Sequence, residues 1–182
     1  MSNYIRTFLP GGTFFITIVT YKRRPFLTTP TALQILKSAW RKTYRKMPFK
    51  LDAICLLPDH LHCLITLPEN DSNFSKRIQM IKGLFSIQYL RSGGEEGKRG
   101  ISRKIKGEAT VWQRRFWEHT IRDEEDMQKH FDYVHYNPIK HSLVKSVVDW
   151  EWSTFHKYVR LGFYHENWSC AEIDNDKYEF GE

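Results

Sequence analysis

Apolar positions along the chain follow two periods, one typical of strands and one typical of helices. Four segments rich in β-branched and aromatic residues predict strands, over residues 12–21, 49–57, 60–67 and 109–121. Apolar residues at helical spacing predict three helices, over residues 28–47, 73–91 and 122–137, and a short helix within 152–162. The order β-α-β-β-α-β-α predicts an α+β sandwich of the ferredoxin or RRM-like kind, with helices packed on a mostly antiparallel sheet.

Residues at the ends of these segments support the boundaries. Thr29 can cap the first helix and Pro30 can occupy its first turn. The connection at Pro58–Asp59 is short enough for an antiparallel hairpin. Acidic residues open the helix at 122, and we expect this helix to stop at Pro138, since proline lacks an N–H and disfavours a helix interior.

Two segments have no periodic pattern. Residues 92–108 combine glycines with charges of both signs, which predicts a flexible loop. Residues 169–182 contain five acids and one lysine, which predicts a solvated acidic tail. The remaining length suits one ordinary core, so we expect a single domain over residues 1–168.

Composition narrows the class of partner. The formal net charge is +7 and 15% of residues are aromatic, a combination that favours an anionic partner such as nucleic acid. The three cysteines show no CxxC spacing, so neither a disulfide framework nor a zinc site is indicated. No signal peptide and no apolar run long enough to span a membrane are present, so we expect a cytoplasmic protein without membrane contact.

Two histidines interrupt the apolar strand over residues 60–67. His60 and His62 are two residues apart and therefore point to the same face, where two imidazoles can ligate one cation. A pair of unrelated surface histidines is the alternative. The setting favours ligands, because imidazoles among Leu, Cys and Ile require polar partners.

Tyr133 and Asn137 lie four residues apart, on one face of the helix over 122–137. If that face lies against the histidines, the Asn137 amide oxygen could be a third ligand. Tyr133 could then attack a phosphodiester whose charge the cation withdraws. The alternatives are a packing tyrosine and an asparagine that caps the helix before proline.

Three stretches of sequence resemble one bacterial family. They are "LLPDHLHCLITLP" (56–68), "RRFWEHTIRDEEDMQKHFDYVHYNPIKHSLV" (114–144) and "DWEWSTFHKYVRLGFY" (149–164). They look like the single-tyrosine HUH transposases, the IS200-like group, and within it the REP-associated tyrosine transposases. HUH denotes histidine, a bulky apolar residue and histidine, matched here by His60, Leu61 and His62. The likeness covers nearly the whole chain and implies the HUH endonuclease fold.

The resemblance also implies roles for individual residues. His60 and His62 would ligate Mg²⁺ or Mn²⁺, and Tyr133 would be the nucleophile. Asn137 stands where related transposases carry a glutamine, four residues after the tyrosine, and would be the third metal ligand. Tyr136 competes for the nucleophile's role, but the motif alignment favours Tyr133.

The implied reaction is metal-dependent cleavage and strand transfer on single-stranded DNA, through a 5′-phosphotyrosine intermediate that needs no nucleotide cofactor. The implied substrate is the REP element, a palindromic hairpin, handled by a monomeric bacterial protein at the nucleoid. Basic side chains are candidates for phosphate contacts and aromatic ones for base stacking, in each case with a plain surface or core role as the alternative. The basic candidates are Lys22, Arg23, Arg24, Lys82, Arg114 and Arg115, and the aromatic ones are Trp112, Phe116 and Trp117.

Two other functions stay open. The protein could recognise REP hairpins without turnover, or, more remotely, it could be an RNA-binding α/β domain whose histidines are incidental. The acidic tail could compete with DNA for basic residues, by similarity to C-terminal extensions in the family. Retention of His60, His62, Tyr133 and Asn137 favours the enzyme, since a pure binder needs no such set.

Overall fold

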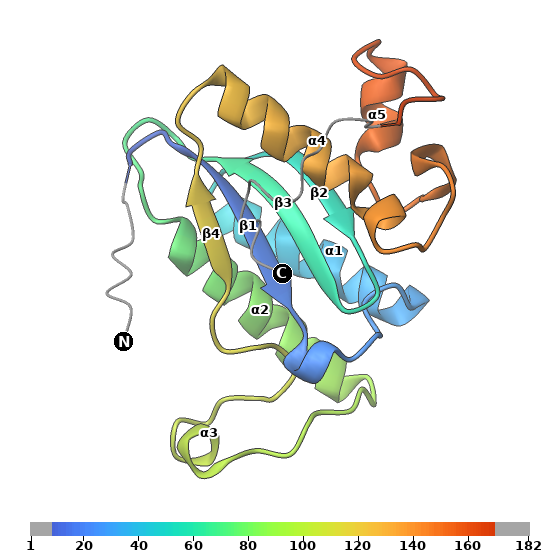
Figure 1. The fold of residues 1–182 in the computed structure, drawn as a ribbon. Helices are drawn as coiled ribbons and strands as arrows, with labels where there is room; N and C mark the ends of the chain where they lie inside the picture. The colour runs from blue at the N-terminus through green and yellow to red at the C-terminus, as the bar shows by residue number, and fades with distance from the viewer. Residues whose placement is uncertain (1–8, 170–182) are drawn as a thin grey trace.

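A four-stranded antiparallel sheet forms the centre of the structure, a computed structural model that describes residues 9–169 (Figure 1). The strand order is β2-β3-β1-β4, so the first strand of the chain lies inside the sheet. The strands are β1 (Thr13–Val19), β2 (Lys50–Leu56), β3 (His60–Thr66) and β4 (Trp117–Thr120). The predicted α+β class and mostly antiparallel sheet are confirmed.

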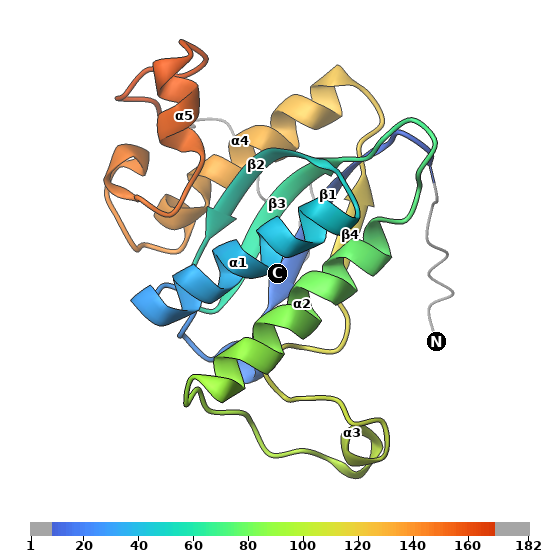
Figure 2. The same ribbon diagram turned by 180° about the vertical axis from the view of Figure 1, so that it is seen from behind.

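Helices cover both faces of this sheet. α1 (Pro30–Lys46) and α2 (Phe74–Arg91) pack side by side on one face, which is turned toward the viewer in Figure 2. α4 (Glu124–Lys140) lies on the opposite face, seen in Figure 1. Beyond it come the short helix α5 (Phe155–Arg160) and the 3₁₀ turn η2 (Val147–Asp149). Another 3₁₀ turn, η1 (Tyr21–Arg23), follows β1.

Alternation along the strands builds a separate core on each face. Phe14 and Ile16 of β1 belong to the cluster under α1 and α2, whereas Phe15 belongs to the cluster under α4. The predicted cap of α1 is confirmed, since Thr29 Oγ1 accepts a hydrogen bond from the Ala32 amide. Cys55 and Cys63 are buried free thiols, one on each face.

The predicted end of α4 at Pro138 is wrong. The helix continues through this proline to Lys140. Pro138 lacks the N–H that would bond to the preceding turn. The turn beyond it is held by bonds from the His141 amide to the Asn137 carbonyl oxygen (3.0 Å) and from the Leu143 amide to the Pro138 carbonyl oxygen (2.9 Å).

Two further predictions need correction. The strand expected over 109–121 is limited to Trp117–Thr120, preceded by a single bridge between Thr20 and Trp112. The segment 92–108, predicted to be a loop, contains the short helix α3 (Ile101–Ile105), so the prediction is wrong for these five residues. The flexibility of the segment stays a prediction. The acidic tail lies outside the described residues apart from Ser169. Within residues 9–169, none of the helices is both long and apolar enough for a membrane span.

Candidate active site

His60 and His62 point to the same face of β3 and are both buried, with 1% and 0% of their surface exposed. Their ring centroids are 4.9 Å apart. His62 Nδ1 lies 2.8 Å from the hydroxyl of Thr17, its cross-strand neighbour on β1. His60 Nδ1 lies 2.6 Å from Asp59 Oδ1. Because Nδ1 is engaged in both rings, Nε2 is the nitrogen that each can offer to a metal ion.

Asp59 orients His60 and also links it to η1. Its other carboxylate oxygen accepts a hydrogen bond from Arg23 Nη1 at 3.1 Å. Partial burial alone would raise the pKa of Asp59, but the bonds from His60 and Arg23 hold it below its usual value. The carboxylate is therefore charged, as a histidine-orienting group should be. The sequence reasoning treated Asp59 only as a turn residue, although an acid directly before the first histidine was a usable signal.

Thr17 is a second contact of the candidate site that the sequence did not reveal. It belongs to an ordinary β-branched strand pattern and becomes a histidine partner only through the register of β1 against β3. The pairing places Thr17 opposite His62 and, on its other side, opposite Trp117 of β4.

α4 carries the other predicted site residues to the same place. Tyr133 is fully buried, with its ring centroid 5.3 Å from that of His62. At the end of the helix, the His141 ring lies 4.9 Å from His60. Asn137 is one turn from each of these residues, so it lies along the histidine pair. The structure thus brings His60, His62, Tyr133 and Asn137 together.

The side-chain amide of Asn137 is buried, and only its nitrogen has a hydrogen-bond partner among residues 9–169. Its Nδ2 donates to the Tyr133 carbonyl oxygen at 3.4 Å. Its Oδ1 is buried and has no hydrogen-bond partner among residues 9–169. A buried acceptor in that state costs free energy, so a ligand for this oxygen would stabilise the protein.

The hydroxyl of Tyr133 has a cationic partner. Lys140 Nζ donates to it at 2.8 Å and lies 4.8 Å from the ring centroid. The sequence reasoning missed Lys140 because it ended the helix before this residue. Tyr136, the competing tyrosine, packs instead against a separate cluster that includes Phe155.

A second polar cluster, absent from the sequence predictions, joins β4 to the first turns of α4. Asp126 Oδ2 accepts hydrogen bonds from His119 Nε2 (2.8 Å) and Arg122 Nε (3.1 Å), and Oδ1 lies 3.1 Å from His130 Nδ1. Burial alone would raise the pKa of Asp126, but these bonds lower it to about 2. Ligand atoms of His119, Asp126 and His130 lie within 4.8 Å of one another, as in a metal site. Since protein donors already pair with this carboxylate, we interpret the cluster as a structural link.

The structure separates the candidates for nucleic-acid contact. Among the basic ones, Lys22, Arg23, Arg114 and Arg115 are exposed, and Arg23 pairs with Asp59. Arg24 donates to the Glu95 carbonyl oxygen, Lys82 to those of Gln113 and Arg114, and Arg114 pairs with Glu108.

The aromatic candidates differ in exposure. Trp112 is only 4% exposed, with its ring against Phe85 in the core, so the prediction that it stacks on bases does not hold in this structure. Phe116 and Trp117 are partly buried and keep some exposed surface.

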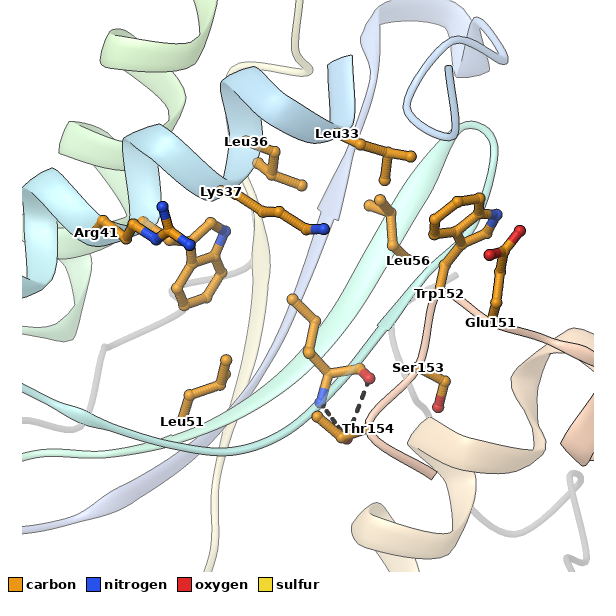
Figure 3. A pocket seen from close by; sticks show the side chains of 12 residues that line it. Leu33, Leu36, Lys37, Arg41, Leu51, Leu56, Glu151, Trp152, Ser153 and Thr154 are labelled. Carbon is orange, nitrogen blue, oxygen red and sulfur yellow. Dashed lines mark hydrogen bonds between the residues drawn. The ribbon is translucent and has the colours of Figure 1, made fainter. Parts of the chain in front are cut away.

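A surface pocket of about 580 Å³ has no histidine among its lining residues, which Figure 3 shows. It is lined mainly by apolar side chains of α1, β2 and the segment 151–154, with Lys37, Arg41 and Glu151 as its charged members. Its β2 residues Ile54 and Leu56 pack with the core under α1, on the sheet face opposite His62. The pocket therefore does not contribute to the histidine site.

Comparisons with known proteins identify a matching family and similar chains. The family described as "Transposase IS200 like" matches residues 13–137, which include both histidines, Tyr133 and Asn137. The chain is 41% identical to the REP-associated tyrosine transposase of Escherichia coli over 174 residues, covering 96% of this chain and 94% of that one. It is 44% identical to a Haemophilus influenzae protein assigned to the same class, over 92% of this chain and 93% of the other.

A solved structure is similar over the full length. It is described as the REP-associated tyrosine transposase bound to a REP hairpin. The TM-score is 0.81 at 40% sequence identity, and the alignment covers 100% of this chain and 98% of the other.

Proposed function

Since this chain belongs to the IS200-like transposases, and within them to the REP-associated tyrosine transposases, we propose that it cleaves and rejoins single-stranded DNA at REP-type palindromic hairpins. One observation carries the proposal. His60, His62 and Tyr133 converge on one face of the sheet, and Asn137, one helical turn from Tyr133, has a buried amide oxygen with no hydrogen-bond partner among the described residues. A protein that only bound DNA would need none of these groups.

A hairpin of this kind is proposed as substrate because the relative of known structure binds one. The net charge of +7 suits a polyanion. We propose phosphate contacts from the basic candidates and base stacking from the two aromatic candidates with exposed surface. These are Lys22, Arg23, Arg24, Lys82, Arg114, Arg115, Phe116 and Trp117. We also propose that it acts as a monomer in the bacterial cytoplasm, where its DNA substrate lies.

His60, His62 and Asn137 fit a divalent ion, which we propose to be Mg²⁺ or Mn²⁺. Two imidazoles oriented through Nδ1 and one buried amide oxygen form a mixed nitrogen and oxygen ligand set. Three protein ligands would leave further coordination positions of the ion for phosphate or water. When bound, such an ion would withdraw charge from the scissile phosphate.

Tyr133 is proposed as the nucleophile. Its hydroxyl oxygen forms a bond to phosphorus while the bond from phosphorus to the 3′ oxygen breaks, and the phenolic proton leaves to solvent. The products are a 5′-phosphotyrosine and a DNA end whose 3′ oxygen takes up a proton. A 3′-hydroxyl can later attack the phosphotyrosine and release Tyr133. The ester conserves the energy of the original bond, so no nucleotide cofactor is needed.

A covalent-adduct assay tests this function. The full chain is incubated with labelled single-stranded DNA that carries palindromic repeats from its host, with and without Mn²⁺, and separated on a denaturing gel. We expect an adduct that requires Mn²⁺, is lost in Tyr133→Phe and persists in Tyr136→Phe, the matched control on the same helix.

Each other outcome supports a different conclusion. An adduct that persists in Tyr133→Phe would refute the assigned nucleophile. Specific, metal-independent hairpin binding without any adduct would favour a REP-binding protein without turnover. Preference for RNA under the same conditions would favour the RNA-binding alternative.

A further inference from the structure

Lys140 and Tyr133 form a close pair at the C-terminal end of α4. They are seven positions apart in the chain, which is almost two full turns, so both project from nearly the same side of the helix. Lys140 Nζ donates a hydrogen bond to the Tyr133 hydroxyl oxygen at 2.8 Å. The same nitrogen is 4.8 Å from the centre of the tyrosine ring. The ammonium group therefore contacts the oxygen that the proposed reaction would use.

This pair exists because α4 continues past Pro138. The last turn is held by the bond from the His141 amide to the Asn137 carbonyl oxygen, and His141 in turn packs against His60. If the helix ended before the proline, Lys140 would no longer lie on the same side of α4 as Tyr133. The same turn thus fixes Lys140 relative to both Tyr133 and the histidine pair.

The surroundings make the contact strong. The Tyr133 ring has no exposed surface and packs against Phe15 and His62, while Lys140 is half-buried. Hydrogen bonds from a cation are shorter and stronger than those between neutral groups, and the low exposure of the Tyr133 ring reduces the screening of this contact by water.

We propose that Lys140 holds the Tyr133 hydroxyl in position and stabilises negative charge on its oxygen during both cleavage and rejoining. The proposal rests on the function proposed above. In cleavage, the phenolic proton leaves to solvent. The Lys140 ammonium keeps its hydrogen bond to the phenolic oxygen while that oxygen forms its bond to phosphorus. In rejoining, the bond between phosphorus and that oxygen breaks, and Lys140 stabilises the departing phenolate until it regains a proton. Lys140 is a donor in both directions and is not the base.

Single-turnover kinetics test the proposal. Adduct formation at saturating DNA and Mn²⁺, and release of purified adduct by a 3′-hydroxyl strand, are measured for Lys140→Gln and Lys140→Arg. Loss of one such donor should slow both directions by about 100-fold, with the Kd for DNA unchanged, and arginine should restore most of the rate. Lys157→Gln is the matched control, because Lys157 is an exposed lysine 4.9 Å from the ring of another tyrosine, Tyr158.

An NMR measurement without DNA distinguishes the proposed role of Lys140 from the proposed DNA cleavage. In protein labelled with ¹³C at tyrosine Cζ, the Tyr133 resonance is assigned by its loss in Tyr133→Phe. The chemical shift of this resonance should change in Lys140→Gln and remain unchanged in Lys157→Gln. A shifted resonance in a protein that forms no adduct would support the contact and contradict the function.

Two results would overturn the role of Lys140. One is a Lys140→Gln variant whose rates stay within about threefold of the parent, well below the effect of a lost donor. The other is a slowed variant whose defect is matched by weaker DNA binding or a lower Tm, which arginine does not restore.

Discussion

Thr17 and His62 lie directly opposite each other in the β1–β3 ladder, and the Thr17 hydroxyl contacts His62 Nδ1 at 2.8 Å. When Nδ1–H donates to this hydroxyl oxygen, Nε2 carries the lone pair that a metal ion needs. The strand register therefore determines which nitrogen of His62 is offered to the site.

Thr17→Val should weaken metal binding while leaving the fold intact. Valine keeps the shape of the side chain but removes the partner of His62 Nδ1. Loss of such an orienting contact lowers metal affinity by about tenfold or more. Titration calorimetry with Mn²⁺ measures the change. Thr13→Val is the control, because Thr13 makes a comparable cross-strand contact, with Thr66, at 2.8 Å. Equal Mn²⁺ affinities in Thr17→Val and the parent would contradict the assignment.

Substitutions of Asn137 should separate the stability of the metal-free protein from its response to metal. Asn137→Asp places a buried charge beside the histidines, so the metal-free Tm should fall and Mn²⁺ should raise it by more than in the parent. Asn137→Leu removes the buried Oδ1 that lacks a partner among the described residues, so its Mn²⁺ response should shrink. Thermal unfolding with and without Mn²⁺ checks both. A Mn²⁺ response that is the same in all three proteins would exclude Asn137 as a ligand.

His135 should make the protein less stable in mild acid. It is fully buried on α4, where burial lowers its pKa from 6.5 to about 3, and its Nε2 pairs with the Thr154 hydroxyl. The folded state therefore disfavours the proton that the unfolded chain binds. Its contribution is fully present above pH 6.5 and is lost as the pH falls toward 3.

We expect His135→Gln to reduce the loss of unfolding free energy between pH 6.5 and 4 by roughly 3 kcal/mol. Urea unfolding at several pH values measures this loss. His165→Gln is the control, because His165 is exposed. If His135→Gln and the parent lose the same amount, buried His135 is not responsible.

Charged Asp126 should stabilise the folded protein at pH values above its unfolded-state pKa of 3.8. The bonds from His119 and Arg122 outweigh burial and lower its pKa to about 2 from 3.8, so this contribution is present above pH 3.8 and lost between 3.8 and 2. Asp126→Asn should lower the unfolding free energy at pH 7 by roughly 2 kcal/mol, a difference that closes near pH 2. Denaturant unfolding at both pH values measures it, with Asp149→Asn at an exposed position as the control. A difference that stays constant with pH would contradict the charged role.

Some features of the site could be predicted because their cause is local. The spacing of His60 and His62 sets a shared face in any strand, and the four-position spacing of Tyr133 and Asn137 sets a shared face in any helix. Errors arose where packing outweighed a local preference. Pro138 normally ends a helix, yet the turn beyond it is held by backbone bonds and by His141 against His60. Trp112 suggested a stacking surface, yet it packs against Phe85 in the core.

The sequence by itself determined the order of elements, the two histidines on one strand face and the family to which the chain belongs, because periodicity and motif spacing are properties of neighbouring residues. Only the tertiary structure decided which residues complete the site. Thr17 reaches His62 through strand pairing, Asp59 orients His60 through the turn geometry, and Lys140 reaches Tyr133 because α4 continues over the sheet. The Thr17–His62 contact and the placement of Tyr133 beside His62 join segments far apart in the chain, through strand register and the docking of α4, and leave no local pattern. The contacts of Asp59 with His60 and of Lys140 with Tyr133 join residues close in the chain, but they depend on the geometry of the turn and on the helix continuing past Pro138.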